Sequence, residues 1–195
     1  MAKESAAASR TEIRLAGEGG QGMILAGIIL AEAAAVHDGK NIVQTQSYGP
    51  EARGGASKAE VIISDGEIDY PKVINADALV AMSQEACDKY SHSLKKGGVL
   101  IVDQDKVKRV PTTRTVKLPI TKLALEATGR AITANVVALG VLVGLTQVVS
   151  REAIEKAVTA RAPKGTAQLN HQALAAGFAA AEHLLSERPQ LVGEV

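Results

Sequence analysis

Residues 12–35 read EIRLAGEGGQGMILAGIILAEAAA and form the unit that decides the fold. A short, partly alternating stretch, Glu12–Leu15, leads into the glycine-rich hexapeptide Gly17–Gly22. An Ala/Leu/Ile-rich run, Met23–Ala35, follows it. Alternation predicts a strand, clustered glycines predict a tight turn, and a long run of helix-forming apolar residues predicts a helix. The stretch therefore predicts the strand, turn and helix with which a Rossmann-like α/β domain begins.

Strands and helices continue to alternate beyond this unit. Further strands are predicted at 41–46, 59–64, 78–82, 99–102 and 113–118, and helices at 84–95, 120–128, 135–146, 151–161 and 173–185. Nearly continuous apolar strands are typical of a mostly parallel sheet that helices cover on both faces. We therefore predict a single three-layer α/β/α domain over residues 11–186, with a helical C-terminal part and flexible tails at 1–10 and 187–195.

Composition narrows the classes of function. The chain has 195 residues, with 22 Lys+Arg against 21 Asp+Glu and 2% aromatic residues, so neither a basic surface nor stacking aromatics point to nucleic acid. Its one cysteine, Cys87, can form neither an intrachain disulfide nor a thiolate cluster or zinc site. No apolar run resembles a signal peptide or a membrane span. We therefore expect a cytoplasmic protein with no membrane partner.

The glycine turn is the first candidate binding site. Gly17, Gly19 and Gly22 match the pattern G-x-G-x-x-G, and Gly20 and Gln21 complete the turn. Such a turn lets a ligand or partner approach the backbone at a helix start, or it simply lets the helix pack closely on the sheet. A dinucleotide site also needs an acidic residue about 20 positions further on, at the end of the second strand.

That acidic residue is missing, because the second predicted strand ends in 44–47, QTQS. Asp38 precedes the strand, and Glu51 belongs to the next loop. Gln44 or Gln46 would have to substitute for it. A stand-alone dinucleotide-binding oxidoreductase therefore remains only an alternative.

The loop after the second predicted strand is the second candidate. Residues 47–55 read SYGPEARGG. The loop combines an aromatic hydroxyl, a guanidinium suited to phosphate or carboxylate, and glycines that permit close approach. It should lie at the same sheet edge as the glycine turn. The alternative is a self-contained turn in which Glu51 pairs with Arg53. The candidate residues are Ser47, Tyr48, Glu51, Arg53, Gly54 and Gly55, together with Asn135, whose amide fits either a helix cap or a bond to the glycine turn.

With residues 17–22, 47–55 and 135–140 in this order, the chain resembles the gamma subunits of 2-oxoacid:ferredoxin oxidoreductases, most closely the 2-oxoglutarate branch. The resemblance implies oxidative decarboxylation of a 2-oxoacid with coenzyme A (CoA), giving acyl-CoA and carbon dioxide while electrons pass to ferredoxin. It implies thiamine diphosphate and magnesium on alpha and beta subunits, and iron–sulfur clusters on cysteine-rich, delta or ferredoxin-like partners. This chain alone would bind none of these cofactors and supply no catalytic residue or metal ligand. The alternative within the same complex is a purely structural, assembly role.

Overall fold

The computed structural model describes residues 9–48, 56–111 and 114–188. Within these ranges the strands are β1 (Arg10–Gly17), β2 (Asn41–Ser47), β3 (Ser57–Ser64), β4 (Ala76–Ala81), β5 (Leu94–Asp103) and β6 (Thr115–Leu118). The α-helices are α1 (Met23–Glu32), α2 (Gln84–Tyr90), α3 (Ile120–Thr128), α4 (Ala134–Thr146), α5 (Arg151–Arg161) and α6 (Ala167–Glu187). A π-helical turn, Ala33–His37, extends α1, and 3-10 turns occur at Ser91–Ser93 and Ala131–Thr133. The predicted tails, 1–10 and 187–195, lie mostly outside the described residues.

The strands form one sheet in the order β2-β3-β1-β4-β5-β6. Neighbours from β1 to β6 are parallel, whereas β3 runs antiparallel to both β1 and β2. Because β3 is antiparallel to both of its neighbours, β1 and β2 run in the same direction. The prediction of a mostly parallel sheet is confirmed, with β3 as the exception. The carboxyl ends of β1, β2, β4 and β5 consequently lie at one edge of the sheet.

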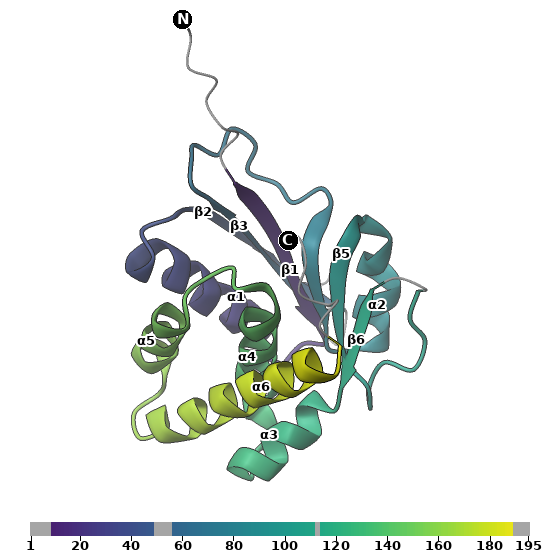
Figure 1. The fold of residues 1–195 in the computed structure, drawn as a ribbon, viewed down its shortest axis with the longest axis vertical. Coiled ribbons are helices and arrows are strands. Elements are labelled where there is room, and N and C mark those ends of the chain that lie inside the picture. Colours follow the sequence, from purple (N-terminus) through teal and green to yellow (C-terminus); the bar gives the residue numbers. More distant parts are fainter. Residues whose placement is uncertain (1–8, 49–55, 112–113, 189–195) are drawn as a thin grey trace, which may run out of the picture.

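Helices cover the two faces of the sheet unequally. Figure 1 shows α1, α3, α4, α5 and α6 on one face and α2 on the other. Ile13 and Leu15 of β1 point into the larger core beneath the five helices. Ala16 points to the smaller core, where Cys87 of α2 packs. The α/β/α architecture and its helical C-terminal part are confirmed.

α4 is apolar on nearly all sides because it lies inside the domain, between the sheet and α6. Its residues from Ala134 to Val143 are all buried. The helix begins directly after the turn at Ala131–Thr133, so its first residues reach the carboxyl edge of the sheet. In the part of the chain that the structure describes, no helix has the length and apolarity needed to cross a membrane.

Two predicted boundaries were wrong. The helix predicted to run to Lys95 ends at Tyr90, and Lys95 lies in β5, where its ammonium pairs with Asp77 at 2.8 Å. Gly97 has φ +88° within β5, near a shift in the register between β4 and β5. The last helix begins at Ala167 rather than 173, because its first, polar turns hide the apolar periodicity.

Candidate functional site

The two candidate loops leave the same edge of the sheet. Gly17, the last residue of β1, is paired with Ser57, and Ser47, the last residue of β2, is paired with Lys58. The Ser57 hydroxyl also donates to the Gly17 carbonyl at 3.2 Å. The chain returning into β3 is held by α2, since the backbone N–H of Ala56 donates to Glu85 at 3.2 Å. The expected common edge is thus present in the described residues.

Gln21 gives the glycine turn its shape. Its side-chain oxygen accepts from the Glu18 N–H at 2.8 Å, and its side-chain nitrogen donates to the Met82 carbonyl at 3.1 Å. The turn is therefore attached to the chain that leaves β4. A Cβ on Gly17 would lie 2.4 Å from the same Gln21 oxygen, so Gly17 is required for packing. The Gln21 amide therefore holds the turn in shape through both of its ends.

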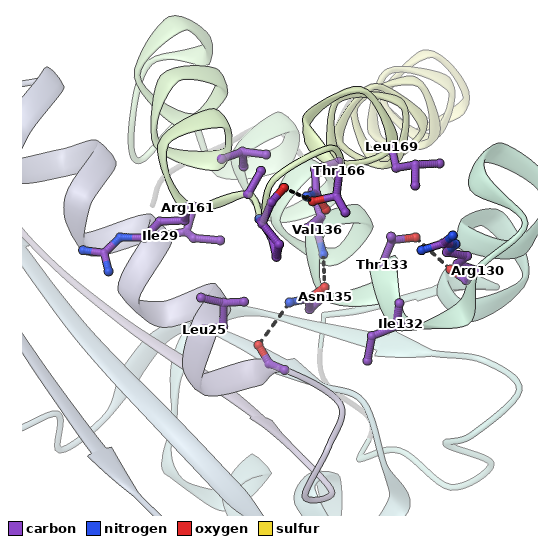
Figure 2. A pocket seen from close by; sticks show the side chains of 15 residues that line it. Leu25, Ile29, Arg130, Ile132, Thr133, Asn135, Val136, Arg161, Thr166 and Leu169 are labelled. Carbon is purple, nitrogen blue, oxygen red and sulfur yellow. Dashed lines mark hydrogen bonds between the residues drawn. The ribbon is translucent and has the colours of Figure 1, made fainter.

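Asn135 fixes the other end of the turn. Its side-chain nitrogen donates to the Gly22 carbonyl at 3.3 Å, and its side-chain oxygen accepts from the Val136 N–H at 2.9 Å, as Figure 2 shows. Gly22 has φ +73°, and a Cβ there would lie 2.7 Å from the Asn135 amide. Asn135 thus makes the bond to the glycine turn that was considered for it. It is not the cap of α4, because the N-cap residue is Thr133 and Asn135 lies within the first turn of the helix.

Gly19 and Gly20 have a different environment from Gly17 and Gly22. A Cβ on either would meet no atom within 4 Å. Gly20 has φ +90°, so its backbone conformation favours glycine, whereas no positive φ is recorded for Gly19. Packing within the described chain therefore does not explain Gly19. It leaves open space at the tip of the turn for a ligand or a partner.

Only the start of the second loop can be placed. Ser47 ends β2, and the Tyr48 side chain is 69% exposed beside it. Glu51, Arg53, Gly54 and Gly55 lie outside the described residues. The predicted ligand or partner contacts of these residues, and the alternative pair between Glu51 and Arg53, therefore stay predictions.

The strand order disfavours the dinucleotide alternative. In a dinucleotide-binding fold the second strand lies next to the first, so the acidic residue at its end is close to the glycine turn. Here β3 separates β1 from β2. Two strand spacings, about 10 Å, therefore stand between the end of β2 and the end of β1. Gln44 lies in β2, and its amide donates to the Thr45 carbonyl at 3.3 Å.

A crevice lies at the point where the chain changes direction across the sheet. After β1 the chain passes to β2 and β3 on one side and then to β4 on the other, and ligands of open α/β sheets bind beyond the carboxyl ends of strands at such a point. A cavity of about 260 Å³ is found there, with Gly20, Gln21, Met82, Lys106 and Ile132 among its lining residues. The Lys106 ammonium makes no hydrogen bond or ion pair within the described chain, so the crevice offers a free cation.

A second cavity, of about 200 Å³, adjoins the first at Ile132. Gly22 and Asn135 belong to its wall, and Leu25 and Ile29 of α1 supply apolar surface. α5 and α6 close the opposite side, where Figure 2 shows Thr166 and Leu169. The glycine turn thus borders two neighbouring hollows.

The sequence did not reveal two residues that support this edge. Asp103, fully buried at the end of β5, accepts from the Thr121 N–H at 2.8 Å and from the Asp105 N–H at 3.0 Å, which joins α3 to β5. The Gln84 amide oxygen accepts from the Lys108 and Arg109 N–H groups at 2.8 and 3.0 Å. An acidic residue directly after a buried strand was the available signal for Asp103. Nothing in the sequence distinguishes Gln84.

Cys87 is buried in the smaller core. Burial raises the pKa of its thiol, and the neighbouring Asp88 carboxylate raises that pKa further. The thiol contacts the Arg109 carbonyl at 3.8 Å. Among the described residues, no group of three or more His, Cys, Asp or Glu side chains is placed to hold a metal ion.

A known protein family matches the part of the chain that contains both candidate loops. The model of the family described as pyruvate ferredoxin/flavodoxin oxidoreductase matches residues 12–180, which include the glycine turn, the second loop and Asn135. The chain belongs to this family.

Two individual members of the family show which of its proteins this chain is similar to. The chain is 53% identical over 180 residues to the 2-oxoglutarate synthase subunit KorC of Methanocaldococcus jannaschii, covering 90% of this chain and 96% of that protein. It is 55% identical, with a TM-score of 0.83, to the gamma subunit of a keto/oxoacid ferredoxin oxidoreductase from Geobacter sulfurreducens, covering 90% of this chain and 98% of that one.

A third likeness concerns the fold alone. The 2-oxoglutarate:ferredoxin oxidoreductase of Magnetococcus marinus, described with 2-oxoglutarate, coenzyme A and succinyl-CoA bound, has a TM-score of 0.79 at 24% identity. The match covers 89% of this chain and 31% of the longer chain. In that enzyme this fold is therefore one part of a longer polypeptide. Family membership confirms the resemblance inferred from residues 17–22, 47–55 and 135–140.

Proposed function

We propose that this chain is the gamma-type subunit of a 2-oxoglutarate:ferredoxin oxidoreductase that acts in the cytoplasm. The observation that carries the proposal is the 53% identity to a 2-oxoglutarate synthase subunit over nearly the full length of both chains. The complex would convert 2-oxoglutarate and CoA to succinyl-CoA and carbon dioxide, with the released pair of electrons passing to ferredoxin.

The chemistry would belong to the partner subunits. Thiamine diphosphate with magnesium supplies decarboxylation in such complexes, and iron–sulfur clusters carry the electrons to ferredoxin. One buried cysteine in the whole sequence cannot ligate a cluster, which supports placing the clusters on other chains. We therefore propose alpha, beta and cysteine-rich delta-type or ferredoxin-like partners.

The residues of this chain would act at the carboxyl edge of the sheet. Gln21 and Asn135 hold the glycine turn, and Gly19 and Gly20 leave its tip open. Lys106 lines the crevice beside it, with a cation that has no ion pair among the described residues. Arg53 and its neighbours in 49–55 belong to the loop that leaves the same edge. We propose that this edge faces the thiamine-bearing subunits and the path by which CoA enters.

Purification from the native source tests the assignment. We expect the chain to elute with a thiamine-binding chain and a cysteine-rich chain, and the preparation to reduce a dye in the presence of 2-oxoglutarate and CoA. Comparing 2-oxoglutarate with pyruvate, 2-oxoisovalerate and indolepyruvate then tests the substrate. A chain that elutes alone would contradict the proposal.

A purely structural role in the same complex is the second candidate. It is favoured by the exposure of Leu25, Tyr48 and Ile132, since apolar side chains gathered at one edge are typical of a protein interface. If the edge serves assembly alone, variants there will loosen the complex while the KM for CoA stays unchanged. A stand-alone dinucleotide-binding oxidoreductase is disfavoured by the position of β3 between β1 and β2.

A further inference from the structure

The apolar cavity between α1, α4, α5 and α6 is too small for a whole cofactor. Its volume of about 200 Å³ lies below the roughly 300 to 1,000 Å³ of small-molecule sites. Leu25 and Ile132 nevertheless stand at its mouth with 42% and 65% of their surface exposed. A hollow of this size with apolar residues at its mouth suits one inserted side chain of another protein.

Apart from the Arg130 guanidinium, the hydroxyl and amide groups that the wall takes from Thr133, Thr166 and Asn135 have partners inside the chain. The Thr133 hydroxyl donates to the Arg130 carbonyl at 2.8 Å, and the Thr166 hydroxyl donates to the Pro163 carbonyl at 2.8 Å. Both ends of the Asn135 amide are bonded as described above. An apolar side chain entering the cavity would therefore remove water without leaving these groups unpaired, which avoids the usual cost of burying polar atoms.

An arginine lies on each side of the cavity, and the two differ in whether their charge is paired. Figure 2 shows Arg161 and Arg130 on opposite sides of it, with Leu25 and Ile132 between them. Arg161 pairs with Glu32, so its charge is compensated. The Arg130 guanidinium is exposed and makes no hydrogen bond, ion pair or ring contact with the described residues. Within the part of the chain that the structure describes, the site thus presents one unpaired cation beside an apolar hollow.

We propose that this cavity is a docking site for a segment of a partner subunit that inserts one aliphatic side chain between Leu25 and Ile132 and places a carboxylate on Arg130. The inference rests on the proposed function, because it assumes that the chain works inside a complex. A carboxylate beside an aliphatic residue matches the charge and the apolar lining together. CoA, with its larger bulk and several polar groups, matches the cavity less well.

Four substitutions in the assembled complex test this docking site. Leu25→Asp places a charge at the mouth of the cavity, and Arg130→Glu reverses the free cation. Val36→Asp is the control for the first, since Val36 is 69% exposed beyond the far end of α1. Lys96→Glu, at an exposed position near the start of β5, is the control for the second. All four sites are exposed, and melting of each purified variant verifies its folding.

Dissociation of the complex on dilution, followed by mass photometry, gives the measurement. We expect Leu25→Asp and Arg130→Glu to raise the concentration of half-dissociation at least 10-fold, and each control to change it less than 2-fold, as for the loss of one interface anchor. Added salt should weaken the wild-type complex more than an Arg130→Ala complex, because it screens the proposed ion pair.

Unchanged dissociation of both test variants would overturn the docking site. If the KM for CoA rises in those variants as well, the cavity belongs to the CoA path instead. A wild-type chain that never associates with thiamine-binding and cysteine-rich chains is a separate outcome, and it would overturn the proposed function itself.

Discussion

Replacing Gly17 with alanine tests how the glycine turn is built. The new Cβ would lie 2.4 Å from the Gln21 side-chain oxygen and 3.1 and 3.2 Å from Met23 and Met82. Gln21 would have to move and lose its bonds to the Glu18 N–H and the Met82 carbonyl. Two hydrogen bonds of about 1 kcal/mol each, with about 1 kcal/mol of overpacking against the methionines, lower the free energy of unfolding by about 3 kcal/mol.

A double-mutant cycle separates the two contributions. Gln21→Ala alone should cost about 2 kcal/mol, for the same two hydrogen bonds. Gly17→Ala in that background should add only the overpacking of about 1 kcal/mol, so the double variant should lose about 3 kcal/mol rather than the sum of about 5. Gly19→Ala is the matched control, because its Cβ meets nothing within 4 Å, and its cost should stay within about 0.5 kcal/mol.

Thermal unfolding of the purified chain, followed by far-ultraviolet circular dichroism, gives these values. For a domain of this size, about 3 kcal/mol corresponds to a fall in Tm of roughly 6 to 12 °C. The reasoning is refuted if the costs of Gly17→Ala and Gln21→Ala simply add, or if Gly17→Ala is as mild as Gly19→Ala.

Three further predictions follow from the site and the composition. Arg53→Ala in the assembled complex should weaken CoA use by about 1.5 to 3 kcal/mol, roughly 10- to 150-fold, if Arg53 meets CoA, or should loosen assembly at unchanged KM if it is an interface residue. Normal assembly with wild-type CoA kinetics would leave Arg53 a local turn residue. The Cys87 thiol, whose pKa is raised by burial, should resist iodoacetamide in the native chain at pH 8 and react once urea unfolds it, and rapid native labelling would contradict this burial. The isolated chain should stay colourless after anaerobic reconstitution with iron and sulfide and should show no 2-oxoacid- and CoA-dependent dye reduction, so a visible thiolate-to-iron band or measurable turnover would refute the division of labour.

The apolar patterns predicted which elements exist but not how β3 is placed. The apolar pattern of a run such as Ala59–Ser64 does not reveal the direction of the strand, so a mostly parallel sheet was predicted without identifying the antiparallel strand. A signal was present nevertheless, because only residues 48–56 join β2 to β3, and a parallel crossover needs a dozen or more residues. The short connection favours an antiparallel pair.

The parts of the candidate site that depend on backbone conformation, such as the glycine turn, could be predicted from the sequence. The turn at Gly17–Gly22 and the helix at Asn135 lie together at the predicted edge. The unpaired state of the Lys106 and Arg130 cations among the described residues was not predictable. The sequence shows that a residue is basic, but it does not show whether the fold brings an acidic partner to it. Asp103 could have been suspected from its position directly after a buried strand, whereas its bond to Thr121 depends on tertiary packing.

The double attachment of the glycine turn also bears on how quickly a partner or ligand can associate. Because Gln21 holds the turn to the end of β4 and Asn135 holds it to α4, the turn is held in one shape before any partner or ligand arrives. Ordering a free loop on binding costs conformational entropy, and a preorganised turn avoids most of that cost. Encounters at this turn therefore need no prior folding step, and weakening either attachment should slow productive association even where every contacting atom is retained.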